Sequence, residues 1–244
     1  MELLVFLVGI CIGLLLNICI YKIPRNQSIF TPYFQCSNCN RSIKWYYING
    51  NCKYCGKKIS CIYPYVNLIS GILFIMLFNE FKLSIDFVIY GFVLSLLVII
   101  AFIDMSFKII PDILVLLIFL GAIVHEIEML FIHKSILYLL DNILGLVIGG
   151  LLFILIFLFS KGGIGGGDVK LISVLGFVLG IPMIFLFIFL SFLLGALYAL
   201  FLLATGIKNR RDSIPFGPFI VLSFIITFFW GEEIIYWYIT TMFV

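Results

Sequence analysis

The chain has 244 residues, of which 64% are hydrophobic and only 11% are charged, and its formal net charge is +3. About a quarter of the residues in a soluble domain are charged, so this composition excludes an ordinary water-soluble protein. Long apolar stretches recur from one end to the other, which predicts a polytopic membrane protein whose core is a bundle of transmembrane helices.

Eight apolar segments predict an all-α bundle of about eight transmembrane helices. The sixth and seventh segments are separated only by Pro182, which interrupts the helical hydrogen-bond ladder, so a single kinked helix is the alternative for this region. The eight predicted spans cover residues 2–20, 62–79, 86–103, 111–130, 136–159, 169–182, 183–205 and 215–240.

The positive charges decide between these counts. With eight spans, all of the 15 Lys and Arg residues except Lys82 and Lys134 fall on one side. The positive-inside rule makes this side cytoplasmic. A merged sixth and seventh span would move Lys208, Arg210 and Arg211 to the outside, so we retain eight spans.

The only long polar stretch, about residues 22–61, follows the first span. It contains two Cys-x-x-Cys pairs, Cys36 with Cys39 and Cys52 with Cys55. Two such pairs are typical of a structural Zn²⁺ site, because four thiolates complete the tetrahedral coordination. Disulfides or four unliganded thiols are the alternatives, although a cytoplasmic location disfavours disulfides. The sequence therefore predicts a small cytoplasmic four-cysteine zinc loop.

Asp104 ends the apolar run Phe87–Ile103 at the cytoplasmic end of the third span. A carboxylate so close to hydrocarbon is costly, which makes it a candidate for function. Asp112 follows Pro111 and has a simpler explanation, because a carboxylate in the first turn of a helix interacts favourably with the helix dipole. We predict a structural or supporting role for Asp112.

Asp168 follows a glycine cluster at residues 162–167 and precedes the sixth span. Glycines allow another chain to approach closely, so such a segment could admit an extended peptide. Alone, the motif is equally consistent with a flexible loop and an aspartate that caps a helix. Lys170 is interpreted as a marker of the cytoplasmic boundary.

Together, the two aspartates favour a catalytic site. One out-and-back pair of spans separates Asp104 from Asp168, so their cytoplasmic ends can be neighbours. Two adjacent carboxyl groups do not ionise together easily; the charged one can then activate water while the protonated one donates to a carbonyl. We expect His125 and His133 to be surface residues at the opposite face.

Two other classes of function are possible. A proton- or cation-coupled membrane transporter could use intramembrane aspartates as a relay, but it needs ionisable groups that reach the outer side. A membrane scaffold that recruits a partner through the zinc loop would explain the cysteines, but it would leave the two boundary aspartates without a role.

Several motifs resemble the type IV prepilin peptidases, which are membrane aspartyl proteases and N-methyltransferases. The resemblance covers nearly the whole chain. The matching stretches are Gly13–Arg25, the two cysteine pairs followed by Tyr63-Pro64, Asp104 with Ile110-Pro111-Asp112, Gly165-x-Gly167-Asp168-Val-Lys170-Leu, and Pro215-Phe216-Gly217-Pro218.

This resemblance implies that Asp104 and Asp168 are the catalytic pair. The substrates would be pilin or pseudopilin precursors of a type IV pilus or protein secretion system, each with a short basic leader that is cut after a glycine. The new N-terminus would be methylated with S-adenosylmethionine. The expected location is the bacterial cytoplasmic membrane, with the catalytic face cytoplasmic, and no nucleic-acid partner is expected.

The predicted division of the chain lies between the second and third spans. Residues 1–84 form an N-terminal part with two transmembrane helices and the zinc loop. Residues 85–244 form a six-helix aspartyl peptidase core that contains both aspartates.

Overall fold

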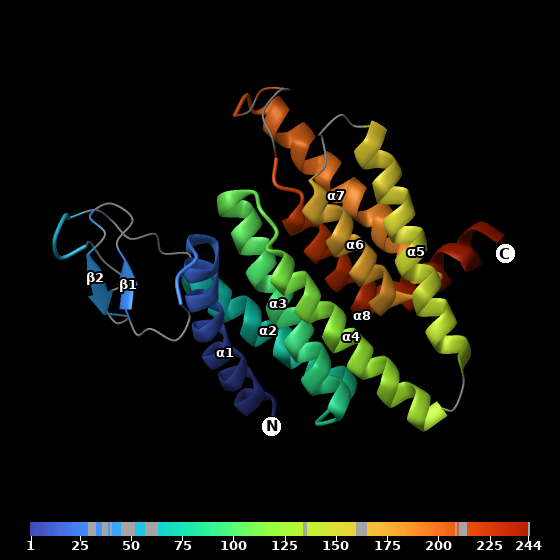
Figure 1. Cartoon of the computed structure of the whole chain (residues 1–244). Helices are drawn as coiled ribbons and strands as arrows, with labels where there is room; N and C mark the ends of the chain where they lie inside the picture. The colour runs from blue at the N-terminus through green and yellow to red at the C-terminus, as the bar shows by residue number, and fades with distance from the viewer. Residues whose placement is uncertain are drawn as a thin grey trace. The chain divides into compact units, whose positions relative to one another are not determined.

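A computed structural model describes residues 1–28, 33–35, 39, 41–44, 52–56, 63–133, 136–159, 165–207, 209 and 214–243. Its described residues form eight α-helices, one 3₁₀ turn and one short hairpin (Figure 1). The elements are α1 Glu2–Lys22, η1 Ile23–Arg25, β1 Tyr33–Gln35, β2 Ser42–Lys44, α2 Tyr63–Phe81, α3 Ile85–Phe107, α4 Asp112–His133, α5 Ile136–Phe159, α6 Gly166–Leu179, α7 Met183–Ala204 and α8 Gly217–Phe243. The predicted all-α membrane bundle is confirmed.

Seven of these helices are long and apolar enough to cross a membrane. The exception is α6, whose 14 residues rise only about 21 Å, less than the roughly 30 Å hydrocarbon core. The eight predicted spans therefore correspond to eight helices, but the sixth is too short to cross alone.

The sixth and seventh helices are separate, as predicted from the charges. Helix α6 ends at Leu179, and Gly180 follows with a positive φ of 64°, a conformation that favours glycine. A methyl group at Gly180 would also lie 2.6 Å from Oδ1 of Asn142. The turn before Met183 therefore depends on this glycine.

The chain divides into two compact units, Met1–Ile99 and Ile100–Val244. The boundary falls within α3, so Asp104 and all later residues belong to the second unit. The predicted division after residue 84, which assigns the whole of α3 to the core, stays a prediction.

In the first unit, α1 packs closely against α2. A methyl group at Gly13 would lie 2.6 Å from Cα of Asn67, so a larger residue would separate the helices. The side chain of Asn17 donates a 2.8 Å hydrogen bond to Oδ1 of Asn67. Small residues and polar contacts of this kind are typical of helix association in membranes. In the part of the chain that connects α1 to α2, β1 and β2 pair antiparallel, with Phe34 opposite Ile43.

In the second unit, α5 and α6 cross with almost no side chain between them. A methyl group at Gly145 would overlap the carbonyl oxygen of Gly176, and one at Gly176 would overlap the carbonyl oxygen of Gly145. On the adjoining turns, a methyl at Gly150 would lie 2.7 Å from Oγ of Ser173. This close contact fixes α6, the helix that carries Asp168, against a long membrane helix.

Aromatic packing positions the start of α8. The ring of Phe216, which precedes α8, lies 6.3 Å from that of Phe153 on α5 and 5.8 Å from that of Phe192 on α7. Deeper in the unit, the rings of Phe187 and Phe224 meet edge to face across α7 and α8. These contacts fix the backbone of Gly217, the first residue of α8.

Candidate active site

Asp104 lies in the last turn of α3 and is buried, with 5% of its surface exposed. Its Oδ2 accepts a 2.8 Å hydrogen bond from the backbone N–H of Gly217. A methyl group at Gly217 would lie 2.8 Å from the same oxygen, so the contact requires glycine. Because Gly217 begins α8, the carboxylate also faces the positive end of that helix dipole.

Asp168 lies in the first turn of α6 and is 8% exposed. Its Oδ2 accepts a 3.0 Å hydrogen bond from the backbone N–H of Gly165. Burial, opposed by the Gly165 hydrogen bond and helped by the charge of Asp104, raises the pKa of Asp168 to about 6. Asp168 therefore holds a proton at much higher pH than an ordinary aspartate.

The structure brings these two predicted residues together in one unit. Asp104 lies near enough that its charge contributes to the raised pKa of Asp168, although one pair of helices separates the two residues in sequence. The start of α6 also lies very close to the α3–α4 connection, because a methyl group at Gly167 would lie 2.9 Å from Cβ of Ile110. Two neighbouring carboxyl groups of different protonation state can perform general acid–base chemistry on a bound carbonyl.

Asp112 and Lys170 form an ion pair beside this site. Helix α4 begins at Asp112, as predicted, and Nζ of Lys170 lies 2.8 Å from both carboxylate oxygens. Both side chains are exposed. The pairing was not predicted, although the opposite charges flank the two aspartate motifs and could have suggested it.

A further buried acid lies in the later part of α4, away from the aspartates in sequence. Glu126 is 6% exposed, and its Oε1 accepts a short hydrogen bond from the side chain of Asn142 on α5. Nδ1 of His125 lies 3.6 Å from the same oxygen. His125, predicted as a surface residue, is partly buried beside this acid, with 15% of its side chain exposed. The side chain of His133 lies outside the described residues. Sequence analysis gave Glu126 no role.

Three of the four predicted metal ligands lie together. The sulfur atoms of Cys39, Cys52 and Cys55 are all within 4.8 Å of one another, and those of Cys39 and Cys52 are 3.7 Å apart. Two sulfurs bound tetrahedrally to one Zn²⁺ are about 3.8 Å apart, given Zn–S bonds near 2.3 Å. The described thiols therefore fit a zinc ion, while Cys36 lies outside the described residues.

Two family profiles match the chain. Residues 91–200 match the type IV leader peptidase family, and residues 7–81 match the bacterial peptidase A24 N-terminal domain. The first match contains both buried aspartates, and the second contains the four cysteines.

Similar proteins cover nearly the whole chain. A prepilin leader peptidase/N-methyltransferase of Bacillus subtilis (strain 168) is 32% identical over 249 residues, covering 97% of each chain. Proteins of the same name from Legionella pneumophila and Aeromonas hydrophila are 29% and 27% identical, covering 98% and 97% of this chain and 94% and 93% of their own. No solved structure matches the chain significantly. None of these findings supports the transporter alternative.

Proposed function

The chain belongs to the type IV leader peptidase family, and we propose that it removes the leader peptide from prepilin-like precursors with Asp104 and Asp168 as its catalytic pair. The observation that carries this proposal is a pair of buried carboxyl groups in one unit, each of which accepts a hydrogen bond from a backbone N–H at the start of a helix. An aspartic peptidase needs this pairing, because one acid must donate a proton while the other accepts one.

The surroundings of the two acids suggest separate roles. With a pKa raised to about 6, Asp168 keeps its proton more readily than an ordinary aspartate and would protonate the oxygen of the scissile carbonyl. Asp104, held by the N–H of Gly217 at the positive end of α8, would accept a proton from the attacking water. The oxygen of that water bonds to the carbonyl carbon, and the amine leaves with a proton when the C–N bond breaks.

The position of the acids suggests where the bond is cut. Asp104 lies in the last turn of a membrane-spanning helix, and the connections rich in Lys and Arg lie on the same predicted side of the membrane. The positive-inside rule supports our proposal that the reaction takes place at the cytoplasmic face of the bacterial cytoplasmic membrane. The bound partners would be pilin or pseudopilin precursors.

Methylation of the new N-terminus is the second proposed activity. Its support is the printed name of the relatives together with the match of residues 7–81 to the family's N-terminal domain. S-adenosylmethionine would supply the methyl group. We assign the donor to no particular residues.

The cysteine loop is proposed to hold one structural Zn²⁺ through Cys36, Cys39, Cys52 and Cys55. Four thiolates leave no open coordination position, so the ion would order the loop and take no part in cleavage. Cys52→Ser should lower the zinc content of purified protein, measured by elemental mass spectrometry, whereas Cys11→Ser on α1 should not. Equal zinc in both variants would refute the site.

Cleavage and methylation can be tested in one assay. Purified protein in liposomes is incubated with a prepilin, with and without S-adenosylmethionine, and the product is weighed by mass spectrometry. Asp104→Asn and Asp168→Asn should each lower the cleavage rate by about 10²–10⁴-fold. Asp141→Asn, an exposed acid on α5, is the matched control and should retain it. Full cleavage by either active-site variant would exclude the pair.

A further inference from the structure

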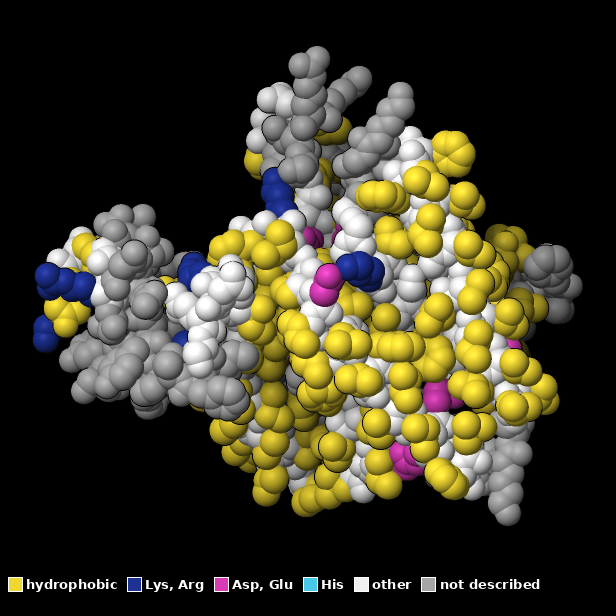
Figure 2. Space-filling view, viewed as in Figure 1, with side chains coloured by type: hydrophobic (Ala, Val, Ile, Leu, Met, Phe, Trp, Pro, Cys, Tyr) yellow, Lys and Arg dark blue, Asp and Glu magenta, His cyan; other side chains and the backbone are white. Residues whose placement is uncertain are grey.

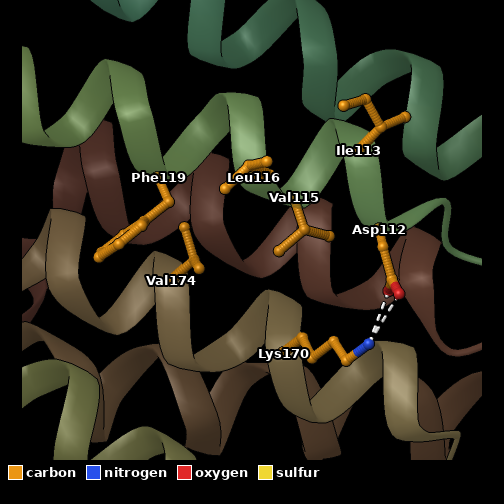
Figure 3. A pocket seen from close by; sticks show the side chains of 7 residues that line it. All are labelled: Asp112, Ile113, Val115, Leu116, Phe119, Lys170 and Val174. Carbon is orange, nitrogen blue, oxygen red and sulfur yellow. Dashed lines mark hydrogen bonds and ion pairs between the residues drawn. The ribbon is translucent and has the colours of Figure 1, made fainter.

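A surface groove runs between α4 and α6 in the second unit. Its volume is about 500 Å³. Figure 3 shows Asp112, Val115 and Phe119 of α4 pointing toward Lys170 and Val174 of α6, while Ile113 points away from α6. The lining is apolar except at one end, where the ion pair closes it. The seven lining residues are Asp112, Ile113, Val115, Leu116, Phe119, Lys170 and Val174.

The groove opens toward hydrocarbon. Helix α4 is one of the membrane-spanning helices, and Leu116 on it is 50% exposed. Figure 2 shows that the face of the molecule in view is covered mainly by hydrophobic side chains. An occupant of this groove must therefore be apolar along the lining of α4. Charged groups avoid hydrocarbon, so the Asp112–Lys170 pair marks the end at which an occupant meets water.

The charged end of the groove adjoins the candidate active site. Helix α6 lines the groove with Lys170 and Val174, and the same helix carries Asp168 in its first turn. On the other side, Asp112 follows Ile110, which lies against Gly167. A chain that leaves the groove at this end therefore arrives at the connection beside the two aspartates.

The ion pair lies across this path, and it can open at small cost. Exposed Lys–Asp pairs contribute little to stability, because water solvates both groups when they separate. The pair also offers one charge of each sign to polar groups of a chain that emerges from the membrane at this point.

We propose that the α4–α6 groove binds the apolar membrane segment of the prepilin next to the bond that is cleaved. This inference rests on the proposed function, because it requires a substrate whose scissile bond lies beside a membrane-embedded segment. The groove supplies apolar contacts for that segment, and its charged end directs the emerging chain toward Asp104 and Asp168. The competing occupant is a lipid acyl chain.

Photo-crosslinking can distinguish these occupants. A benzoyl-phenylalanine probe replaces Leu116 in the groove or, as the control, Leu200 on α7. Both leucines lie four residues from a helix end on the same predicted side of the membrane, and they are 50% and 62% exposed. Each probe is placed in the Asp168→Asn background, reconstituted in liposomes with a prepilin and irradiated.

The groove proposal expects a prepilin adduct at position 116 at least about tenfold stronger than at position 200. Adducts of equal strength, or adducts with lipid alone at both positions, would overturn it. The unmodified enzyme is tested on the same prepilin in parallel. If that enzyme cleaves and no selective adduct forms, only the groove proposal fails; if it does not cleave, the proposed function fails.

Filling the groove gives an independent kinetic test. Val174→Trp should raise KM for the prepilin at least tenfold and change kcat much less, because the catalytic pair stays in place. Leu200→Trp adds the same side chain to an exposed position outside the groove and should change neither constant. An unchanged KM in a folded Val174→Trp enzyme would contradict binding in the groove.

Discussion

The second unit holds buried carboxyl groups in two regions, and the two regions hold them differently. Asp104 and Asp168 accept hydrogen bonds from backbone N–H groups of glycines at the starts of α8 and α6. Glu126, within α4, accepts one from the side chain of Asn142, and its Oε2 accepts none from the described residues. Burial alone therefore does not mark a catalytic acid.

The difference lies in how precisely a group is fixed and in what lies beside it. A backbone donor is fixed by its helix, whereas a side-chain donor can change rotamer. The charge of Asp104 also contributes to the raised pKa of Asp168, whereas Glu126 lies beside His125 and the side-chain amide of Asn142. We interpret Glu126 as a contact that joins α4 to α5, and the aspartates as the pair that performs chemistry.

The largest expected effect on the cleavage rate comes from a side chain added at Gly217, whose backbone N–H donates to Asp104. In Gly217→Ala, the added methyl would lie 2.8 Å from Oδ2 of Asp104, so the carboxylate must move. A shift of about 1 Å in a catalytic group can lower a rate by about 10²-fold, and we expect a loss of this order in the cleavage rate. The matched control is Gly166→Ala, where no atom lies within 4 Å of the new methyl. Equal cleavage by both variants, measured on the same prepilin, would contradict the role of Gly217.

The pH dependence of cleavage tests whether Asp168 is the proton donor. If Asp168 must carry a proton, kcat/KM should fall as pH rises through its pKa of about 6, by about tenfold per pH unit at higher pH. The sign follows because deprotonation removes the donor. Glu126→Gln should leave this alkaline limb unchanged. A flat profile between pH 6 and about 9 would show that Asp168 is not the proton donor.

Removing the other buried acid should affect stability and leave chemistry intact. Glu126→Ala deprives the partly buried Asn142 amide of its acceptor, which costs about 1 kcal/mol of unfolding free energy. Thermal unfolding in detergent should show the loss, while cleavage per folded molecule stays at the level of the unmodified protein. Glu232→Ala, at an exposed position of α8, should cause neither change. Loss of cleavage in a folded Glu126→Ala protein would show that Glu126 also takes part in the reaction.

The smallest expected effect concerns the exposed ion pair. Asp112→Lys and Lys170→Asp should each lower stability by about 1 kcal/mol or less, and the double exchange should recover most of that loss. Unfolding temperatures of the four proteins provide the measurement. Additive losses without recovery would show that the two side chains do not interact in the membrane.

Much of this architecture followed from hydrophobicity and charge. The eight helices occupy the predicted segments, because an apolar run in lipid must satisfy its backbone hydrogen bonds within a helix. The separation of α6 from α7 followed from the Lys and Arg residues near position 210. The resemblance to the prepilin peptidases is confirmed by the family match. The catalytic roles of Asp104 and Asp168 stay predictions.

Other features could not be read from one sequence. Nothing in the local pattern indicates that α6 begins at Gly166, or that the buried Glu126 contacts His125 and the side chain of Asn142. The pairing of Asp112 with Lys170 depends on the contact between α4 and α6. The β1–β2 hairpin within the polar loop was likewise not predicted.

By itself, the sequence determined the membrane environment, the order of the helices and the two acids at helix ends, because the cost of burying charge in hydrocarbon acts on each segment separately. Only the tertiary structure decided that the N–H of Gly217 holds Asp104, and that the start of α6 presses against Ile110 beside Asp168. These contacts join residues that are far apart in the sequence and depend on close helix packing. Local sequence patterns do not indicate which distant residues come into contact.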